Sequence, residues 1–163
     1  MSKIRILVAD DHPIVREGLI AILDTQEDFE VVGEASNGND AIDRIAELSP
    51  DVLLLDLEMP VMDGLGVLQT LKEQASDVRV IVFTVFDTDD RIMSAVQTGA
   101  KGYLLKGAPR DQIFNAVRIV NQGGSLLEPV VASRLMEQVN RSRNDPDALT
   151  PRELEVLPLL ASG

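Results

Sequence analysis

The chain of 163 residues contains no cysteine and only one histidine, which limits the metal and covalent chemistry open to it. Without cysteine it has no disulfides and no thiolate metal sites, as suits a reducing compartment such as the cytoplasm. No apolar run approaches the roughly 20 residues that cross a bilayer, and the start Met1-Ser2-Lys3 lacks a signal-peptide pattern. The sequence therefore predicts a cytoplasmic protein with no membrane partner.

Basic residues are also scarce, and the formal net charge is -12 at pH 7. Acidic residues outnumber basic ones both before and after Asn121, so neither part of the chain is basic. Such a chain repels phosphodiester backbones, and the sequence shows no locally basic face for nucleic acid. The 45% hydrophobic content is ample for one packed domain and a smaller appendage.

The stretch from Asp51 to Gly64 organises the rest of the chain. Val52 to Leu55 is a short unbroken apolar run, typical of a strand that is covered on both faces in a parallel sheet. The run ends on the carboxylate of Asp56. Met59-Pro60 and Asp63-Gly64 then turn the chain before the next helical pattern. This predicts a single acid at the mouth of a sheet.

Strand and helix patterns alternate five times within the first 122 residues. Right-handed crossovers between parallel strands leave few alternatives for such a chain. We therefore expect an α/β fold with a doubly wound, five-stranded parallel sheet in the order 2-1-3-4-5. The predicted strands cover 4–9, 29–35, 52–55, 78–83 and 101–105; the predicted helices open at Pro13 and after the cap Asn37, and cover 65–73, 87–98 and 111–122.

Four of these strands end in reactive groups. Asp10 and Asp11 follow the first strand, Asp56 the third, Thr84 the fourth and Lys106 the fifth. Ligands of such sheets bind at the carboxyl ends of the strands, where the strand order reverses. Crowded carboxylates raise one another's pKa and cost stability unless a cation joins them. Mg²⁺ fits best, because it prefers oxygen ligands and commonly works with phosphate.

With Mg²⁺ bound, one aspartate can attack phosphorus and become an acyl phosphate. Asp56 is the best candidate because it stands alone at the end of the central strand. Lys106 would pair with the phosphoryl oxygens, and Thr84 would donate a hydrogen bond to them. Each residue singly has a simpler explanation, since a lone aspartate after a strand is usually a turn or helix cap. Their joint placement favours a site.

These residues resemble the receiver domain of two-component response regulators over about residues 3 to 122. Tyr103 falls at the position of the family's switch aromatic. The resemblance implies a flavodoxin-like fold and a histidine kinase that phosphorylates Asp56. It implies that Mg²⁺ is bound by Asp56, by the backbone carbonyl of Glu58 and by Asp10 or Asp11, and that Thr84 and Tyr103 rotate inward on phosphorylation.

The chain departs from the receiver pattern at several positions. Gly107 follows the lysine where many receivers have a cis proline, and glycine can itself supply unusual backbone angles. Val85 is bulkier than the usual residue. Glu58 and Phe86 stand where the family tunes dephosphorylation, which leaves the acyl-phosphate lifetime open. His12 is expected to be a residue at the start of a helix that touches no metal.

Beyond Gln122 the pattern changes. Gly123-Gly124-Ser125 predicts a loosened chain, Pro129 to Arg141 a helix within a linker over 123–148, and residues 149–163 resemble the first helix of a LuxR-type DNA-binding domain. The chain thus resembles a NarL/FixJ-type transcription factor that forms a homodimer on phosphorylation. No recognition helix follows, so we expect DNA binding only from the full-length regulator.

Two other functions stay open. A Mg²⁺-dependent phosphohydrolase would usually have a second aspartate two residues after the nucleophile, where this chain has Glu58. A constitutive interaction module would act by dimerisation alone, with a vestigial acidic site. The favoured prediction is a phosphoacceptor signalling protein that catalyses only its own phosphorylation and dephosphorylation.

Overall fold

The computed structural model describes residues 3–85, 89–127 and 136. A compact unit extends from Met1 to Glu128, and a second unit covers Pro129–Gly163, of which only Met136 is described. The predicted linker helix and the LuxR-like segment 149–163 therefore lie outside the described residues. So do Phe86, which precedes the predicted helix 87–98, and the first two residues of that helix.

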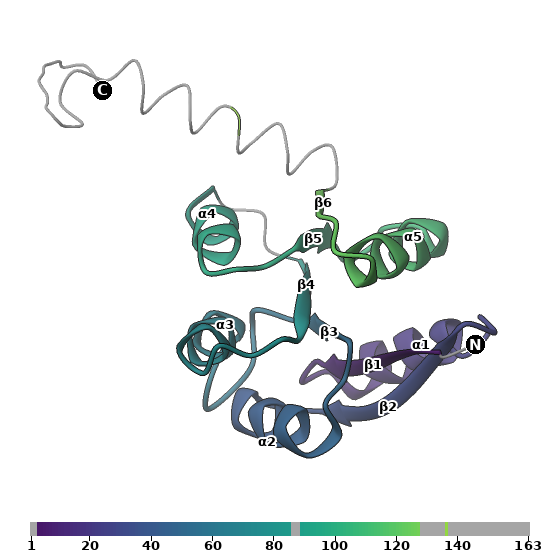
Figure 1. The fold of residues 1–163 in the computed structure, drawn as a ribbon, viewed down its shortest axis with the longest axis horizontal. Helices are drawn as coiled ribbons and strands as arrows, with labels where there is room; N and C mark the ends of the chain where they lie inside the picture. The colour runs from purple at the N-terminus through teal and green to yellow at the C-terminus, as the bar shows by residue number, and fades with distance from the viewer. Residues whose placement is uncertain (1–2, 86–88, 128–135, 137–163) are drawn as a thin grey trace, which may run out of the picture. The chain divides into compact units, whose positions relative to one another are not determined.

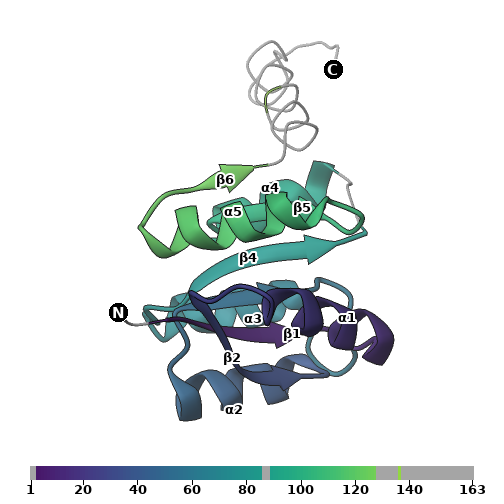
Figure 2. The ribbon, with the colours of Figure 1, turned by 90° about the vertical axis from the view of Figure 1, so that its right-hand side faces the viewer.

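The sheet is entirely parallel and has the order β2-β1-β3-β4-β5-β6 (Figures 1 and 2). The five predicted strands and their order are confirmed. The structure adds β6, which pairs with β5 at the edge although Gly123-Gly124-Ser125 predicted a loosened chain. The strands are β1 (Ile4–Ala9), β2 (Phe29–Ala35), β3 (Val52–Leu55), β4 (Arg79–Thr84), β5 (Gly102–Leu105) and β6 (Leu126–Leu127).

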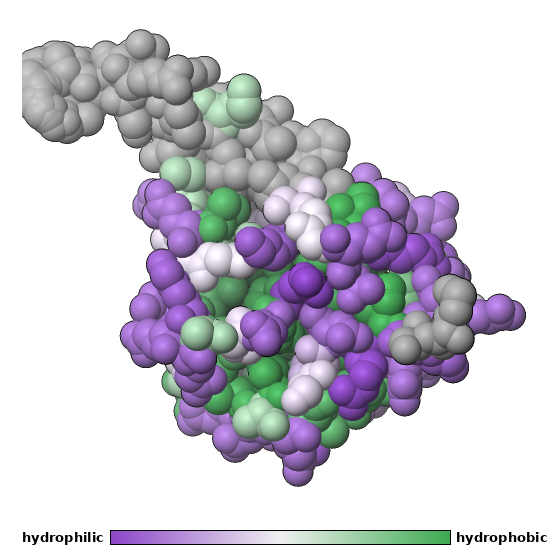
Figure 3. Space-filling model, in the orientation of Figure 1, coloured by the Kyte–Doolittle hydropathy of each residue, from purple (hydrophilic) through white to green (hydrophobic). Residues whose placement is uncertain are grey.

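Helices cover both faces of the sheet, with α1 and α5 on one face and α2, α3 and α4 on the other (Figure 1). The first two begin where the sequence predicts them, and the three helices with predicted bounds agree within two residues at each end. Among the described residues, none of the helices combines the length and the apolar character of a membrane span. Hydrophilic residues border most of the face drawn in Figure 3. The helices are α1 (Pro13–Leu23), α2 (Gly38–Leu48), α3 (Gly64–Glu73), α4 (Asp89–Gln97) and α5 (Arg110–Asn121).

The core explains why β3 is apolar throughout. Side chains of a strand alternate between faces, so Val52 and Leu54 face one helical layer while Leu53 and Leu55 face the other. All four are buried. Val52 and Leu54 belong to a cluster with side chains of α1 and α5, including Leu19. With no polar position inside it, the strand presents its first carboxylate only where it leaves the core, at Asp56.

Two short caps fix the helices nearest this end of the sheet. The side chain of Asn37 accepts a hydrogen bond from the backbone N–H of Asp40 at the start of α2, as predicted. Asp63 does the same for Gly66 at the start of α3. The Asp63-Gly64 pair therefore both turns the chain after β3 and starts the next helix.

Candidate functional site

The first aspartate of the site lies at the end of β1, between two neighbouring strands. The backbone N–H of Asp10 donates to the Ala35 carbonyl of β2 at 3.0 Å, which continues the pairing of the strands. Its side chain is only 3% exposed. One carboxylate oxygen accepts a hydrogen bond from the backbone N–H of His12 at 2.9 Å. Asp10 is thus a buried acid whose direction is set by the turn into α1.

Asp56 lies beside Asp10 because β1 and β3 are adjacent. Its backbone N–H donates to the Ala9 carbonyl at 3.0 Å, so the two chains leave the sheet together. The residue is 2% exposed, and Oδ1 accepts a long hydrogen bond of 3.3 Å from the backbone N–H of Glu58. The prediction that two strand ends bring these carboxylates together at one rim is confirmed.

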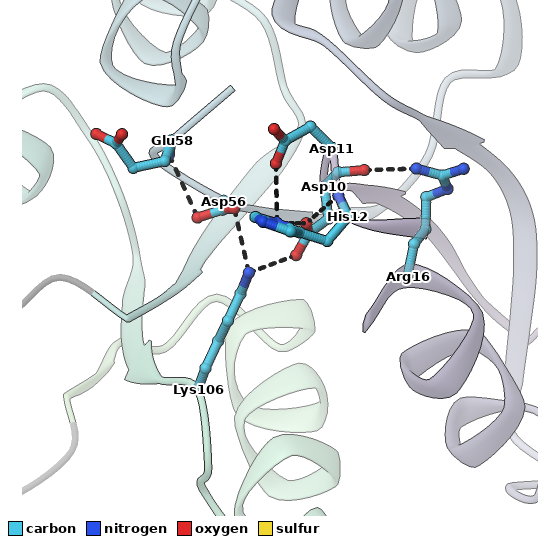
Figure 4. Close-up of polar contacts among 7 residues, drawn as sticks. All are labelled: Asp10, Asp11, His12, Arg16, Asp56, Glu58 and Lys106. Atoms are coloured by element: carbon cyan, nitrogen blue, oxygen red, sulfur yellow. Dashed lines mark hydrogen bonds and ion pairs between the residues drawn. The ribbon is translucent and has the colours of Figure 1, made fainter. Parts of the chain in front are cut away.

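Lys106 joins the two buried carboxylates (Figure 4). Its Nζ lies 2.7 Å from Asp10 Oδ2 and 3.1 Å from Asp56 Oδ2. Its backbone N–H donates to the Thr84 carbonyl at 2.8 Å, which fixes the end of β5 against the end of β4. The lysine side chain is itself mostly buried. One ammonium therefore serves two carboxylates, and this pair of acids remains incompletely neutralised.

The electrostatics of the rim reflect this imbalance. Burial raises the pKa of Asp56, and the neighbouring charge of Asp10 raises it further, although Lys106 and the Glu58 N–H act in the opposite direction. Burial opposes the charge on Lys106, but hydrogen bonding and attraction to Asp10 and Asp56 leave its pKa raised. The raised pKa values favour the charged form of Lys106 and disfavour the anionic form of Asp56. An additional cation would stabilise the anionic form of Asp56.

Asp11 supplies further evidence for a cation. Its Oδ1 is inaccessible to solvent and makes no hydrogen bond within the described residues. One ligand atom each from Asp10, Asp11, His12 and Asp56 lies within 4.8 Å of all the others. Carboxylate oxygens in this number fit a hard divalent ion such as Mg²⁺, which would complete its shell with water. The described side chains therefore fit the predicted metal.

Arg16 of α1 supports the acidic turn, and the sequence analysis did not single it out. Its Nη1 donates to the backbone carbonyl of Asp10 at 2.7 Å (Figure 4). Its Nε pairs with Glu34 Oε1, also at 2.7 Å. Glu34 lies on β2 opposite Val8 of β1. Only that strand register reveals the pair, because Arg16 and Glu34 are distant in the sequence and each alone resembles a surface charge.

The loop after β3 is closely packed against the carboxyl end of that strand. A Cβ on Gly64 would lie 2.6 Å from the Asp56 carbonyl and 2.7 Å from Leu57 Cα, so only glycine fits there. Val61 has a φ of 70°, a strained conformation for a β-branched residue, and its side chain is exposed. Gly64 therefore keeps α3 close to Asp56, and the strain of the turn falls on Val61.

The comparisons with known proteins decide the family. The family model described as "Response regulator receiver domain" matches residues 6–118. The chain belongs to the response regulator receiver family. The transcriptional regulatory protein LiaR of Bacillus subtilis is 41% identical over 163 residues, covering 98% of this chain and 77% of LiaR. The oxygen regulatory protein NreC of Staphylococcus carnosus is 39% identical over 169 residues, with the same coverage of each chain.

Solved structures give the same family. The signal receiver domain of the putative response regulator NarL from Mycobacterium tuberculosis has a TM-score of 0.73 and 38% identity, covering 76% of this chain and 99% of that one. A LuxR-family two-component response regulator from Aurantimonas sp. SI85-9A1 has a TM-score of 0.80 and 27% identity, covering 85% and 99%. The predicted receiver fold and its LuxR-family relationship are confirmed.

The two predicted switch residues of this receiver lie on adjacent strands. Thr84 is the last residue of β4, and Tyr103 of β5 is paired with Val82. Both are fully buried. Their inward rotation on phosphorylation stays a prediction. Gly107, after Lys106, has a φ of 102°, so glycine does supply the unusual backbone angle at the position where many receivers have proline.

Proposed function

We propose that this receiver accepts a phosphoryl group on Asp56 from the phosphohistidine of a histidine kinase. The observation that carries the proposal is the position of Asp56. It is a buried carboxylate at the carboxyl end of the central strand, next to Asp10 and within 3.1 Å of the Lys106 ammonium. A carboxylate oxygen there can act as a nucleophile, and the Lys106 ammonium compensates part of the charge of an incoming phosphoryl group.

The residues divide the work of phosphoryl transfer. A carboxylate oxygen of Asp56 attacks phosphorus, the P–N bond to the kinase histidine breaks, and the imidazole leaves with the bonding electrons. Lys106 pairs with the phosphoryl oxygens and Thr84 donates to them. Asp10 or Asp11, Asp56 and the Glu58 carbonyl would hold Mg²⁺, which when bound neutralises the charge that the phosphoryl group brings.

The consequence is a change in the receiver surface. Once phosphorylated, the Thr84 and Tyr103 region on β4 and β5 repacks, and this favours a homodimer. The named relatives include a transcriptional regulatory protein, so the dimer would control transcription in the full-length regulator. Residues 1 to 121 carry 11 Lys and Arg against 21 Asp and Glu, so the receiver itself is not the part that contacts DNA.

Mass spectrometry after incubation with acetyl phosphate and Mg²⁺ tests the proposal. We expect one labile phosphoryl adduct that maps to Asp56, is absent when Mg²⁺ is chelated and is absent in Asp56→Asn. Asp43→Asn, which removes an exposed carboxylate of α2, is the matched control and should be modified like the parent chain. An adduct that persists in Asp56→Asn would overturn the proposal, and no adduct at all would favour a constitutive interaction module.

A further inference from the structure

The single histidine of the chain lies at the mouth of the acidic site. His12 is the N-cap residue of α1 and has an extended backbone, but its side chain makes no capping hydrogen bond. Pro13 follows it at the first helical position, so one backbone donor is already absent there. The imidazole is 63% exposed and does not contribute to the core. Helix capping and packing therefore leave the position of this ring unexplained.

The ring nitrogen faces the carboxylates of the site. His12 Nδ1 makes a hydrogen bond of 3.3 Å with Asp10 Oδ1 and lies 3.0 Å from Asp11 Oδ1, within ion-pair distance (Figure 4). Despite this short distance Asp11 Oδ1 has no hydrogen bond among the described residues, so the nitrogen and the oxygen are not aligned as donor and acceptor. Ligands about 2.1 Å from one metal ion lie about 3 Å apart when adjacent, which is the separation found here.

We propose that His12 Nδ1 is a ligand of the metal that the acidic site holds, and that it shifts the site toward Mn²⁺ and the later divalent metals relative to Mg²⁺. The proposal deepens the function proposed above and rests on its metal site. Mg²⁺ gains little from imidazole because it prefers oxygen and retains its water. Mn²⁺, Co²⁺ and Zn²⁺ accept nitrogen readily, with affinity rising along that series up to copper.

The arrangement has a direct chemical consequence. Carboxylate and carbonyl ligands alone make an all-oxygen site, whereas the addition of one imidazole makes a mixed site of borderline softness. Solvent reaches the exposed imidazole, so an ion can exchange without opening the fold. The phosphoacceptor Asp56 belongs to the same ligand group. Phosphorylation of this receiver should therefore proceed at lower concentrations of Mn²⁺ than of Mg²⁺, and the difference should depend on His12.

Metal titration of His12→Gln tests the proposal through binding alone. At pH 8, where an ordinary imidazole is neutral, we expect the variant to bind Mn²⁺ about tenfold more weakly and Mg²⁺ within about twofold of the parent chain. Glu17→Gln is the control, because it changes an exposed residue of the same helix away from the site. Equal losses for both metals would show a purely electrostatic or structural role and would overturn the proposal.

Pulsed electron paramagnetic resonance of the Mn²⁺ complex gives the direct readout. Because the chain has one histidine, a coupling from an imidazole nitrogen can be assigned only to His12. We expect that coupling in the parent chain and its loss in His12→Gln. A Mn²⁺ complex without it would overturn the proposal, yet Mg²⁺-dependent modification of Asp56 in the same sample would leave the proposed function intact. Failure of Mg²⁺ to support that modification would count against the function itself.

Discussion

Two aspartate sites on this molecule pair with cations, and their pKa values move in opposite directions. Asp28 receives two hydrogen bonds from Arg118, at 2.8 and 2.9 Å, and the two side chains are 48% and 37% exposed. The hydrogen bond from Arg118 lowers the pKa of Asp28. Asp56 has a lysine at 3.1 Å, yet burial and the charge of Asp10 raise its pKa. A carboxylate that forms an ion pair can therefore still have a raised pKa.

The difference lies in burial and stoichiometry. Arg118 serves one carboxylate in water and also covers the Phe29 ring at 4.8 Å, so its role is structural. Lys106 serves two carboxylates inside the protein, where desolvation is costly. The charge of Asp28 is balanced by Arg118, whereas Lys106 balances only one of the two negative charges of Asp10 and Asp56. The acidic cluster therefore differs from the Asp28–Arg118 pair in that its charges are incompletely neutralised.

The largest effect should follow from removing the shared cation. Lys106→Met leaves Asp10 and Asp56 buried without their ammonium, and we expect the metal-free protein to lose about 3 kcal/mol of unfolding free energy. Mg²⁺ should restore part of that loss by binding only the folded state. Urea unfolding with chelator and with Mg²⁺ measures both. Lys101→Met, at an exposed lysine, is the control, and a similar loss there would contradict the comparison.

A smaller loss of stability is expected for substitution of Arg16. This residue contacts the backbone of Asp10 but is not among the candidate metal ligands. Arg16→Gln removes a charged hydrogen bond to the Asp10 carbonyl and should cost about 1.5 to 2 kcal/mol of unfolding free energy. It should also weaken Mg²⁺ binding several-fold. Calorimetric titration measures that loss. Glu34→Gln keeps the hydrogen bond to Asp10 and should weaken Mg²⁺ binding less; an equal effect would place the role in the Glu34 pair instead.

The smallest effect is a difference in pH dependence between the two aspartate sites. The raised pKa of Asp56 means that ionisation destabilises the metal-free fold, so its contribution is lost as pH rises from 3.8 through its folded pKa. Asp28 does the opposite, stabilising above 3.8 and losing that contribution as pH falls. We therefore expect Asp56→Asn to gain stability relative to the parent chain as the pH rises through that range.

Asp28→Asn should instead lose stability relative to the parent chain above pH 3.8. The loss should be less than about 1 kcal/mol because the pair is partly exposed. Denaturation in chelator at several pH values between 3 and 7 compares the three proteins. If both variants moved in the same direction, burial would not be the cause that separates the two sites.

The sequence could predict which of these residues lie together because they follow strands. An apolar run that stops at a carboxylate, repeated in parallel strands, places Asp10, Asp56 and Lys106 at one rim with no knowledge of side-chain positions. Arg16 was not found because its partners are a backbone carbonyl and a glutamate on another strand, which only the register reveals. Likewise β6 was missed because two residues after a glycine turn carry no periodic pattern.

His12 shows a second limit of the sequence. A lone histidine before a proline at a helix start is explained by local structure, and that is how its pattern is best interpreted. The metal-ligand role proposed for its nitrogen depends on the structure, which places Asp11 Oδ1 3.0 Å away with no hydrogen bond. Such distances between side-chain atoms depend on how the chain packs, so the sequence alone does not reveal them.

A crystal structure of the chain with Mg²⁺ and beryllofluoride, a phosphoryl mimic, tests the central claim most directly. The account predicts beryllofluoride bonded to an Asp56 oxygen and an ion held by Asp56, the Glu58 carbonyl and Asp10 or Asp11. It also predicts that Lys106 Nζ turns from Asp10 to the fluoride atoms. An Asp56 carboxylate that stays unmodified, with Lys106 still between the two acids and no ion beside them, would contradict it.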